Sequence, residues 1–538
     1  GDDDLEREGD AGREYHRRQN WSVQWRGKTS AVLQEPAGYS RGTYAGDRMK
    51  IYQRLSVRKG SAFQFKMLME KDPGETALTD FVSGAVSVGN LPGAVRMVAG
   101  DFRIRAGQGL LFGGARSFGK GAAVIEPTLR DGWGIPEGIS SDEVNFFRGL
   151  AAGTGVGPVS VILFGSVRTL SAHISTEGDL RGIDESGYHR TATELDRRDR
   201  LTNRSFGGLF RVLAGDWLAA GVNVLRSSLS VRETGEGRPA PSTATTRRGS
   251  IDLRIGLPPF TIIGEVVLAG AEVPWIAGIL FVPSEKTRIV IVRRFYPAMP
   301  EFRRTFGFAD GSTGQNEAGT YLGAGISIYP GLIAAGYLDL FSSSAPEPGA
   351  FFPPVGIDRL ISIRYIPSKR FGIETRYRSR TVEVAGNEVS GAGLPTPGNG
   401  VKREDKYRCE VHWKPAERLT CRFRLEYSVA SPGTKGETDR GSMVFADLTL
   451  EPSRAVTIHS RLQLFGTDSY ASRIYTMEAD LPGTLTNAVL SGEGSRWYLI
   501  CAWRLSEHVR FSMKYSRFRR DDLRKIGSGA DELPSNIV

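Results

Sequence analysis

The sequence predicts an all-β protein, a large transmembrane antiparallel up-and-down β-barrel. Three observations predict this fold. Apolar and polar residues alternate through many segments along the whole chain. Tight turns and long polar loops follow one another in alternation. The apolar faces of the segments also carry aromatic residues near their ends, as membrane-spanning strands do.

Alternation with a period of two is the strongest pattern in the chain. In RMKIYQRLSVR, Ile51 and Val57 lie on one face, and Lys50 and Arg58 lie on the other. The same pattern recurs in DKYRCEVHWK (405–414), LTCRFRLEY (419–427) and VRFSMKYSR (509–517). Segments of about 9–12 residues match the tilted strands of a bilayer-spanning barrel, and we count about 22–24 of them.

The connections between the segments are of two kinds. Tight turns are expected at 58–61, 90–93, 213–216, 256–259, 283–286, 367–370, 415–418, 452–455 and 506–508. Long polar loops are expected at 107–145, 174–204, 233–247, 297–318 and 385–404. Barrels of the Gram-negative outer membrane have short periplasmic turns and long extracellular loops, so this asymmetry predicts that location.

The composition of the two faces predicts which one points outward. The apolar faces carry the aromatic residues Tyr407, Trp413, Tyr427, Trp497 and Trp503. The polar faces carry too many arginines for a packed core to bury. The polar side is therefore expected to be a wet lumen. The apolar side is expected to contact outer-membrane lipid and lipopolysaccharide.

One barrel domain is expected over residues 19–538, after an acidic, flexible segment at 1–18. Within the barrel, GDFRIRAGQGLLFGGARSFGKG (100–121) begins as a strand and continues into a glycine-rich stretch with large apolar residues. Its spacing fits neither a P-loop nor a dinucleotide fingerprint, so no nucleotide or other cofactor is expected. We predict that 107–145 folds inward as a plug or constriction that packs against protein.

Arginine-rich rows on the polar faces are the most informative candidate for function. The cations expected to line the path are Arg103, Arg105, Arg116, Lys120, Arg148, Arg376, Arg378, Arg408 and Arg424. Such a lining would favour anionic solutes or polymers. The alternative is a network of cross-strand ion pairs that stiffens the wall, because acidic residues share the same faces.

No motif for catalysis or metal binding is found. The six histidines form neither an HExxH motif nor a paired ligand set, and no GxSxG elbow occurs. We therefore predict neither a metal site nor an enzyme. A surface-loop or lumenal enzyme stays a hypothesis only if the fold brings an acid–base pair to hydrogen-bond distance.

An ordered set of motifs also resembles a known family. The motifs are residues 100–121, SSDEVNFFRGLAA (140–152), ESGYHRTATELDRRD (185–199), NEAGTYLGAGISIYP (316–330), ADLPG (479–483), GEGSRWYL (492–499) and KIGSGADEL (525–533). They resemble the predicted outer-membrane β-barrel proteins that follow an N-terminal helix-hairpin-helix segment in some Gram-negative bacteria. The chain corresponds to the barrel portion, and the helix-hairpin-helix itself is not expected within it. Family members continue into a final strand, so the closing strand is expected to be missing or to pair differently.

Together these features predict a channel or conduit with an arginine-rich lumen. The alternative is a non-conducting structural or docking component of an outer-membrane assembly for secretion or DNA uptake. Envelope proteins are possible partners in either case. Nucleic acid is a weaker candidate partner, because only the family resemblance and the net charge of +10 point to it.

Overall fold

The computed structural model describes residues 21–538, except 114–118, 131, 177, 233–242, 271, 299–305, 312–313, 348–349, 351, 390–394 and 432–437. The predicted flexible segment at 1–18 and the predicted lumen residue Arg116 lie outside the described residues.

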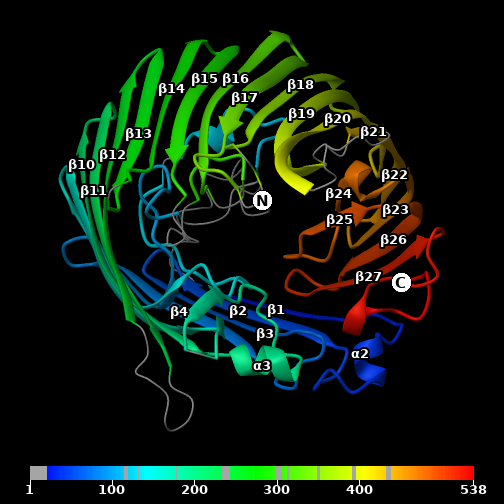
Figure 1. The fold of residues 1–538 in the computed structure, drawn as a ribbon, viewed down its shortest axis with the longest axis horizontal. Coiled ribbons are helices and arrows are strands. Elements are labelled where there is room, and N and C mark those ends of the chain that lie inside the picture. Colours follow the sequence, from blue (N-terminus) through cyan, green and yellow to red (C-terminus); the bar gives the residue numbers. More distant parts are fainter. Residues whose placement is uncertain are drawn as a thin grey trace.

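A single sheet of 23 strands forms the wall of the molecule, within the predicted range of 22–24. Each of its strands pairs antiparallel with the next one along the chain. Figure 1 shows the strands of this wall following one another around a ring. The first strands are β1 (Trp21–Ser30), β2 (Lys50–Lys59), β3 (Phe63–Lys71), β4 (Phe81–Leu91), β5 (Val95–Phe102), β6 (Phe147–Val156), β7 (Val159–Leu170), β10 (Leu201–Ala214), β11 (Leu218–Val231) and β12 (Thr243–Leu257).

The wall continues through thirteen further strands. They are β13 (Phe260–Leu268), β14 (Trp275–Ser284), β15 (Thr287–Tyr296), β16 (Glu317–Tyr329), β17 (Leu332–Ser342), β18 (Val355–Ser368), β19 (Phe371–Val389), β20 (Pro395–Ala416), β21 (Leu419–Ser431), β22 (Asp439–Ser453), β23 (Val456–Thr467), β26 (Glu493–Arg504) and β27 (Arg510–Arg520). Most are long enough to span a bilayer when tilted.

Small elements occupy the loops. Two hairpins are formed by β8 (Ala172–Ile174) with β9 (Leu180–Ile183) and by β24 (Ile474–Glu478) with β25 (Thr486–Leu490). The short helices are α2 (Ala37–Ser40), α3 (Ala192–Arg197), η1 (Glu126–Thr128), η2 (Tyr470–Ser472) and η3 (Gly529–Asp531). Among the described residues, none of the helices has the length and apolar character needed to cross a membrane.

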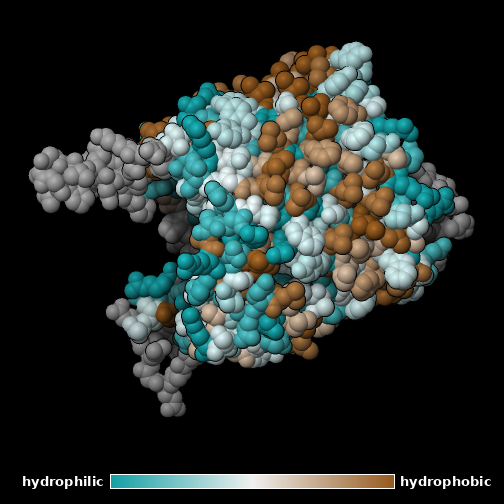
Figure 2. Space-filling view, turned by 90° about the vertical axis from the view of Figure 1, so that its right-hand side faces the viewer, coloured by the Kyte–Doolittle hydropathy of each residue, from teal (hydrophilic) through white to brown (hydrophobic). Residues whose placement is uncertain are grey.

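The faces of the strands are oriented as predicted. On β18, Ile361 is 61% exposed, whereas its neighbour Leu360 on the other face is 2% exposed. On β22, Val444 and Leu448 are likewise exposed, and Asp447 between them is buried. Figure 2 shows such hydrophobic side chains gathered over the outer surface of the wall. An apolar exterior around a polar interior is the arrangement of an outer-membrane β-barrel.

The connections alternate as predicted, with turns such as 60–62 and 92–94 at one end and longer loops at the other. The loop expected at 385–404 is wrong. β19 instead continues to Val389, and β20 begins at Pro395 in register with it. The polar composition of this stretch predicted a loop, but its backbone groups pair between β19 and β20.

The two end strands of the sheet, β1 and β27, each contact another segment of the chain. Val538 exchanges two backbone hydrogen bonds of 2.7 Å with Phe518 on β27, so the last residues lie along that strand. On the β1 side, Lys28 donates to Thr484 in the β24–β25 hairpin at 2.7 Å. The last residues and the β24–β25 hairpin thus contact the two end strands of the sheet. Whether a closing strand is missing or pairs differently stays a prediction.

Candidate functional site

The candidate site is the chain between β5 and β6, residues 103–146, which we call the inward segment. It leaves the wall after Phe102 and returns at Phe147. Its residues Leu110, Leu111 and Phe112 are at most 5% exposed, in one apolar cluster with residues of wall strands between β3 and β18. The segment therefore packs against the inner face of the barrel, which confirms the prediction that it folds inward against protein (Figure 1).

A single carboxylate on β13 holds the first turn of the inward segment. Glu265, 3% exposed, accepts hydrogen bonds from the backbone N–H groups of Gln108 at 2.8 Å, Leu110 at 3.0 Å and Leu111 at 3.2 Å. Burying a carboxylate without hydrogen-bond partners costs free energy, and these three donors offset that cost. Gly107 makes this approach possible, because its φ is +53° and an added Cβ would lie 2.8 Å from Glu265.

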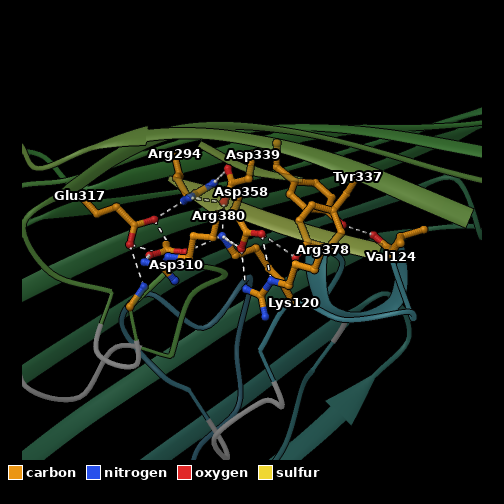
Figure 3. A network of polar contacts seen from close by, with 12 residues as sticks. Lys120, Val124, Arg294, Asp310, Glu317, Tyr337, Asp339, Asp358, Arg378 and Arg380 are labelled. Carbon is orange, nitrogen blue, oxygen red and sulfur yellow. Dashed lines mark hydrogen bonds and ion pairs between the residues drawn. The ribbon is translucent and has the colours of Figure 1, made fainter. Parts of the chain in front are cut away.

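A second attachment is made by Lys120, whose side chain is 2% exposed. Its Nζ lies 2.5 Å from Asp310, 2.7 Å from Asp339 and 3.1 Å from Asp358. Asp339 belongs to β17 and Asp358 to β18, whereas Asp310 precedes β16. Lys120 thus ties the inward segment to two wall strands and to a second loop (Figure 3).

Three arginines of the wall complete this cluster. Arg294, with no exposed surface, binds Glu317 at 2.5 Å and Asp339 at 2.9 Å. Arg378 binds Asp358 at 2.5 Å, and Arg380 binds Asp310 at 2.6 Å. The cluster, which we call the tether network, consists of Lys120, Arg294, Arg378, Arg380, Asp310, Glu317, Asp339 and Asp358. Four cations face four carboxylates, so the network is neutral. Pairing of this kind allows charges to be buried.

The predicted lumen residues are mostly engaged in ion pairs. Arg148 binds Asp101 at 2.6 Å, Arg376 binds Glu374 at 2.7 Å and Arg408 binds Glu426 at 2.8 Å. Arg424 binds Glu410. These contacts are those of the ion-pair alternative, and the role of the arginines in selecting solutes stays a prediction.

Two further predicted residues lie on the inward segment itself. Arg103 donates to the Ser140 hydroxyl at 2.8 Å and to the Asn145 carbonyl at 3.0 Å, so it closes the base of the segment. Arg105 is exposed, and its backbone bridges to Gly134. Among the predicted residues that the structure describes, Lys120 and Arg378 meet in the tether network.

The register of two wall strands brings cations face to face. Arg376 on β19 is the direct partner of Arg408 on β20, and Arg378 is the partner of Lys406. Like charges opposite one another destabilise a sheet unless neighbouring groups offset them. Here the carboxylates bound to these cations do so, which leaves a row of paired charges on the inner face.

Sequence reasoning missed Glu265, Arg294 and the three aspartates that bind Lys120. Each stands on the polar face of an alternating strand or in a loop, where an acidic residue is ordinary. The only available signal was the opposite charge of Lys120 in an otherwise apolar, glycine-rich segment. That signal indicates that a partner exists and does not identify it.

The hairpin β24–β25 is a second inward element that the sequence did not predict. Arg461 on β23 donates to the Met477 carbonyl at 2.8 Å and binds Asp447 at 2.5 Å. Arg496 binds Glu478 at 2.5 Å. In Figure 1 this hairpin points into the ring beside β23 and β26. The lumen is thus occupied from two sides.

One group of side chains in the loops has the composition of a metal site. Ligand atoms of Glu75, Asp80 and His189 lie within 4.8 Å of one another. Asp80 is already bound by His189 and Arg198, and Glu75 accepts from two backbone N–H groups. Both carboxylates thus already have hydrogen-bond or ion-pair partners within the protein. That the protein binds no metal stays a prediction.

Comparison with known proteins adds distant neighbours. In sequence, the chain matches neither a protein-family model nor a curated protein. Similar solved structures include the siderophore receptor PirA from Acinetobacter baumannii, 8% identical with a TM-score of 0.43, over 96% of this chain and 79% of that one. The copper transporter OprC has the same identity and score, over 96% and 82%. The FrpB iron transporter from Neisseria meningitidis is 10% identical with a TM-score of 0.39, over 93% and 76%. The barrel assignment rests on the chain's own ladders, turns and apolar exterior.

Proposed function

We propose that the protein is a conduit of the Gram-negative outer membrane whose lumen is gated by the inward segment and favours anionic solutes. The observation that carries the proposal is the way in which the segment is attached. It joins the wall covalently only at its two ends, and side-chain contacts hold the rest. A segment held in this way can be released without breaking the strand ladders, as loops that gate access are.

The preference for anionic solutes is supported by the cation rows of β19 and β20. Arg376 lies directly opposite Arg408, and the wall uses two carboxylates, Glu374 and Glu426, to offset a repulsion that an oppositely charged pair would not create. Retaining such a pair at the inner face supports a role in passage of solutes rather than in stability alone. Rings and rows of arginine or lysine are used in this way in anion pores.

Single-channel recording in planar bilayers tests the conduit. We expect small, intermittent conductance from the native protein and larger, longer openings from Lys120→Met, because the tether is then loosened. The matched control is Lys414→Met, which removes a partly exposed lysine near the end of β20 that pairs with the exposed Glu417. A folded barrel that stays silent in both the native and the Lys120→Met forms would refute the conduit.

Ion preference requires a different pair of variants. Arg378 and Arg380 belong to the tether network, so their reversal would loosen the inward segment as well. The double variant Arg376→Gln with Arg408→Gln avoids this problem, and we expect it to shift the reversal potential toward cations. Arg370→Gln, in an exposed pair with Glu417, is the control. An unchanged reversal potential in the double variant would refute the anion preference.

A second candidate function is a docking component that does not conduct. It is favoured by the neutrality and burial of the tether network, which fits a permanent plug as well as a gate. The family resemblance would connect such a barrel with a helix-hairpin-helix segment and hence with DNA handling. Silent but folded barrels in the recordings above would support this candidate.

A further inference from the structure

Three loop segments bring a serine, a histidine and an aspartate into one hydrogen-bonded row. The Ser171 hydroxyl lies 3.1 Å from Nε2 of His189, and Nδ1 of the same ring lies 2.6 Å from Asp80. Asp80 follows β3, Ser171 follows β7, and His189 precedes α3. All three residues are on the long connections β3–β4 and β7–β10, at the end of the barrel that carries the long loops.

We propose that Ser171, His189 and Asp80 form a nucleophilic triad that hydrolyses carboxylic esters at the end of the barrel that carries the long loops. The order of the contacts supports this assignment. One ring nitrogen of His189 faces a carboxylate and the other faces a hydroxyl, which is the arrangement that activates a serine. This activity is independent of the proposed conduit.

The surroundings hold each member in place. Asp80 and His189 have side chains that are 4% and 6% exposed, so their contact is sheltered from water. The second oxygen of Asp80 is bound by Arg198 at 2.7 Å, and Arg198 also donates to the Asp80 carbonyl at 3.2 Å. The backbone N–H of His189 donates to Glu75 at 3.1 Å. Ser171 is the partly exposed member, as a nucleophile must be.

The surroundings of His189 strengthen its affinity for a proton, as a general base requires. Burial lowers its pKa, but the hydrogen bond and charge of Asp80 outweigh burial and raise the pKa above its usual value. Burial raises the pKa of Asp80, but His189 and Arg198 lower it more strongly. The pKa of Asp80 therefore lies below its usual value. Asp80 is therefore a positioning residue that stays ionised and stabilises the imidazolium formed during reaction.

The substrate class follows from the charges around the ring. Glu75 on the β3–β4 loop has a carboxylate oxygen within 4.8 Å of His189, and Arg198 faces the ring across Asp80. A carboxylate at this distance disfavours an anionic group next to the reacting carbonyl. We therefore assign an ester that is uncharged around its carbonyl group.

The reaction balances with water as the only co-reactant. The Ser171 oxygen attacks the ester carbonyl carbon while His189 takes the hydroxyl proton. The C–O bond to the alcohol then breaks, and His189 returns the proton to the leaving oxygen. Water attacks the acyl-serine and gives one proton to His189, and Ser171 leaves as the hydroxyl with that proton. Ester and water have become acid and alcohol.

The first test is covalent labelling of the full chain, folded in detergent, with a fluorophosphonate probe. Mass spectrometry should find the label on Ser171, and the label should be absent from Ser171→Ala. Ser186→Ala is the matched control, since Ser186 lies in the same loop region and binds Asp184. A folded native barrel, judged by its heat-shifted electrophoretic mobility, that carries no label on Ser171 would overturn the proposal.

The second test is hydrolysis of p-nitrophenyl acetate. General-base catalysis by a positioned histidine contributes about 100-fold or more, so Ser171→Ala and His189→Gln should each lose at least that factor. Ser186→Ala should retain the native rate. In Asp80→Asn the acidic limb of the pH–rate profile should move to lower pH, because the group that raises the His189 pKa is gone. Equal rates for the native protein and Ser171→Ala would contradict a nucleophilic role.

Discussion

Removing the Lys120 charge is the sharpest test of how the inward segment is held. Lys120→Met keeps the length of the side chain and removes the cation from three carboxylates at 2.5, 2.7 and 3.1 Å. Three cations then face four carboxylates in a buried cluster. Breaking a buried pair by removing one partner costs about 3–5 kcal/mol. That cost should fall on the docking of the segment, because the strand ladders are unchanged.

The corresponding change in the docking equilibrium is about 100-fold to 3,000-fold, since each 1.4 kcal/mol is tenfold. Hydrogen exchange followed by mass spectrometry should show this increase in peptides from 119–130 and much less in peptides from the wall. Lys414→Met, which removes a partly exposed ion pair with Glu417, should change the free energy of exchange by no more than about 1 kcal/mol. Equal exchange of 119–130 in the two variants would refute the tether.

A double-mutant cycle assigns the effect to the network. Asp310→Asn removes a carboxylate that binds both Lys120 and Arg380. When it is combined with Lys120→Met, cations and carboxylates are again equal in number. We expect the combined cost to be about 0.5–3 kcal/mol smaller than the sum of the single costs. Simple additivity would show that the two residues act independently.

Two further predictions concern the ends of the inward segment. Gly107→Ala should weaken docking of the inward segment by about 1–3 kcal/mol, because the residue has a positive φ and its new Cβ would meet Glu265. Hydrogen exchange at 108–112 measures this loss. Gly121→Ala, with open space around the new Cβ, should leave that exchange unchanged. Burial raises the pKa of Glu143 to about 8, so the folded state keeps a proton that the unfolded chain loses. Stability should therefore fall as pH rises from about 4.5 to about 8. In Glu143→Gln the midpoint of urea unfolding should depend less on pH over that range. The same pH dependence in the variant and the native protein would contradict a raised pKa at Glu143.

Much of the wall could be predicted from the sequence because membrane strands obey a local rule. In VRFSMKYSR, Phe511 and Met513 alternate with Arg510 and Lys514, and both apolar residues are more than half exposed on the outer face. Lipid outside and a polar interior require this alternation in every strand. The composition of each segment was therefore sufficient to place its faces. The prediction at 385–404 failed because it followed the polar composition of these residues, whereas the backbone pairing of β19 with β20 continues to Val389 and Pro395.

The sequence by itself determined the alternating strands, the asymmetry of turns and loops, and the inward course of a segment too apolar to remain in solvent. Only the tertiary structure decided which groups meet there. Lys120 is separated from Asp310 by 190 residues and from Asp339 by 219, and His189 is separated from Asp80 by 109. Alternation depends on the environment of each residue along one strand. Ion pairs and triads depend on how the sheet of 23 strands curves, which brings distant loops and strands side by side.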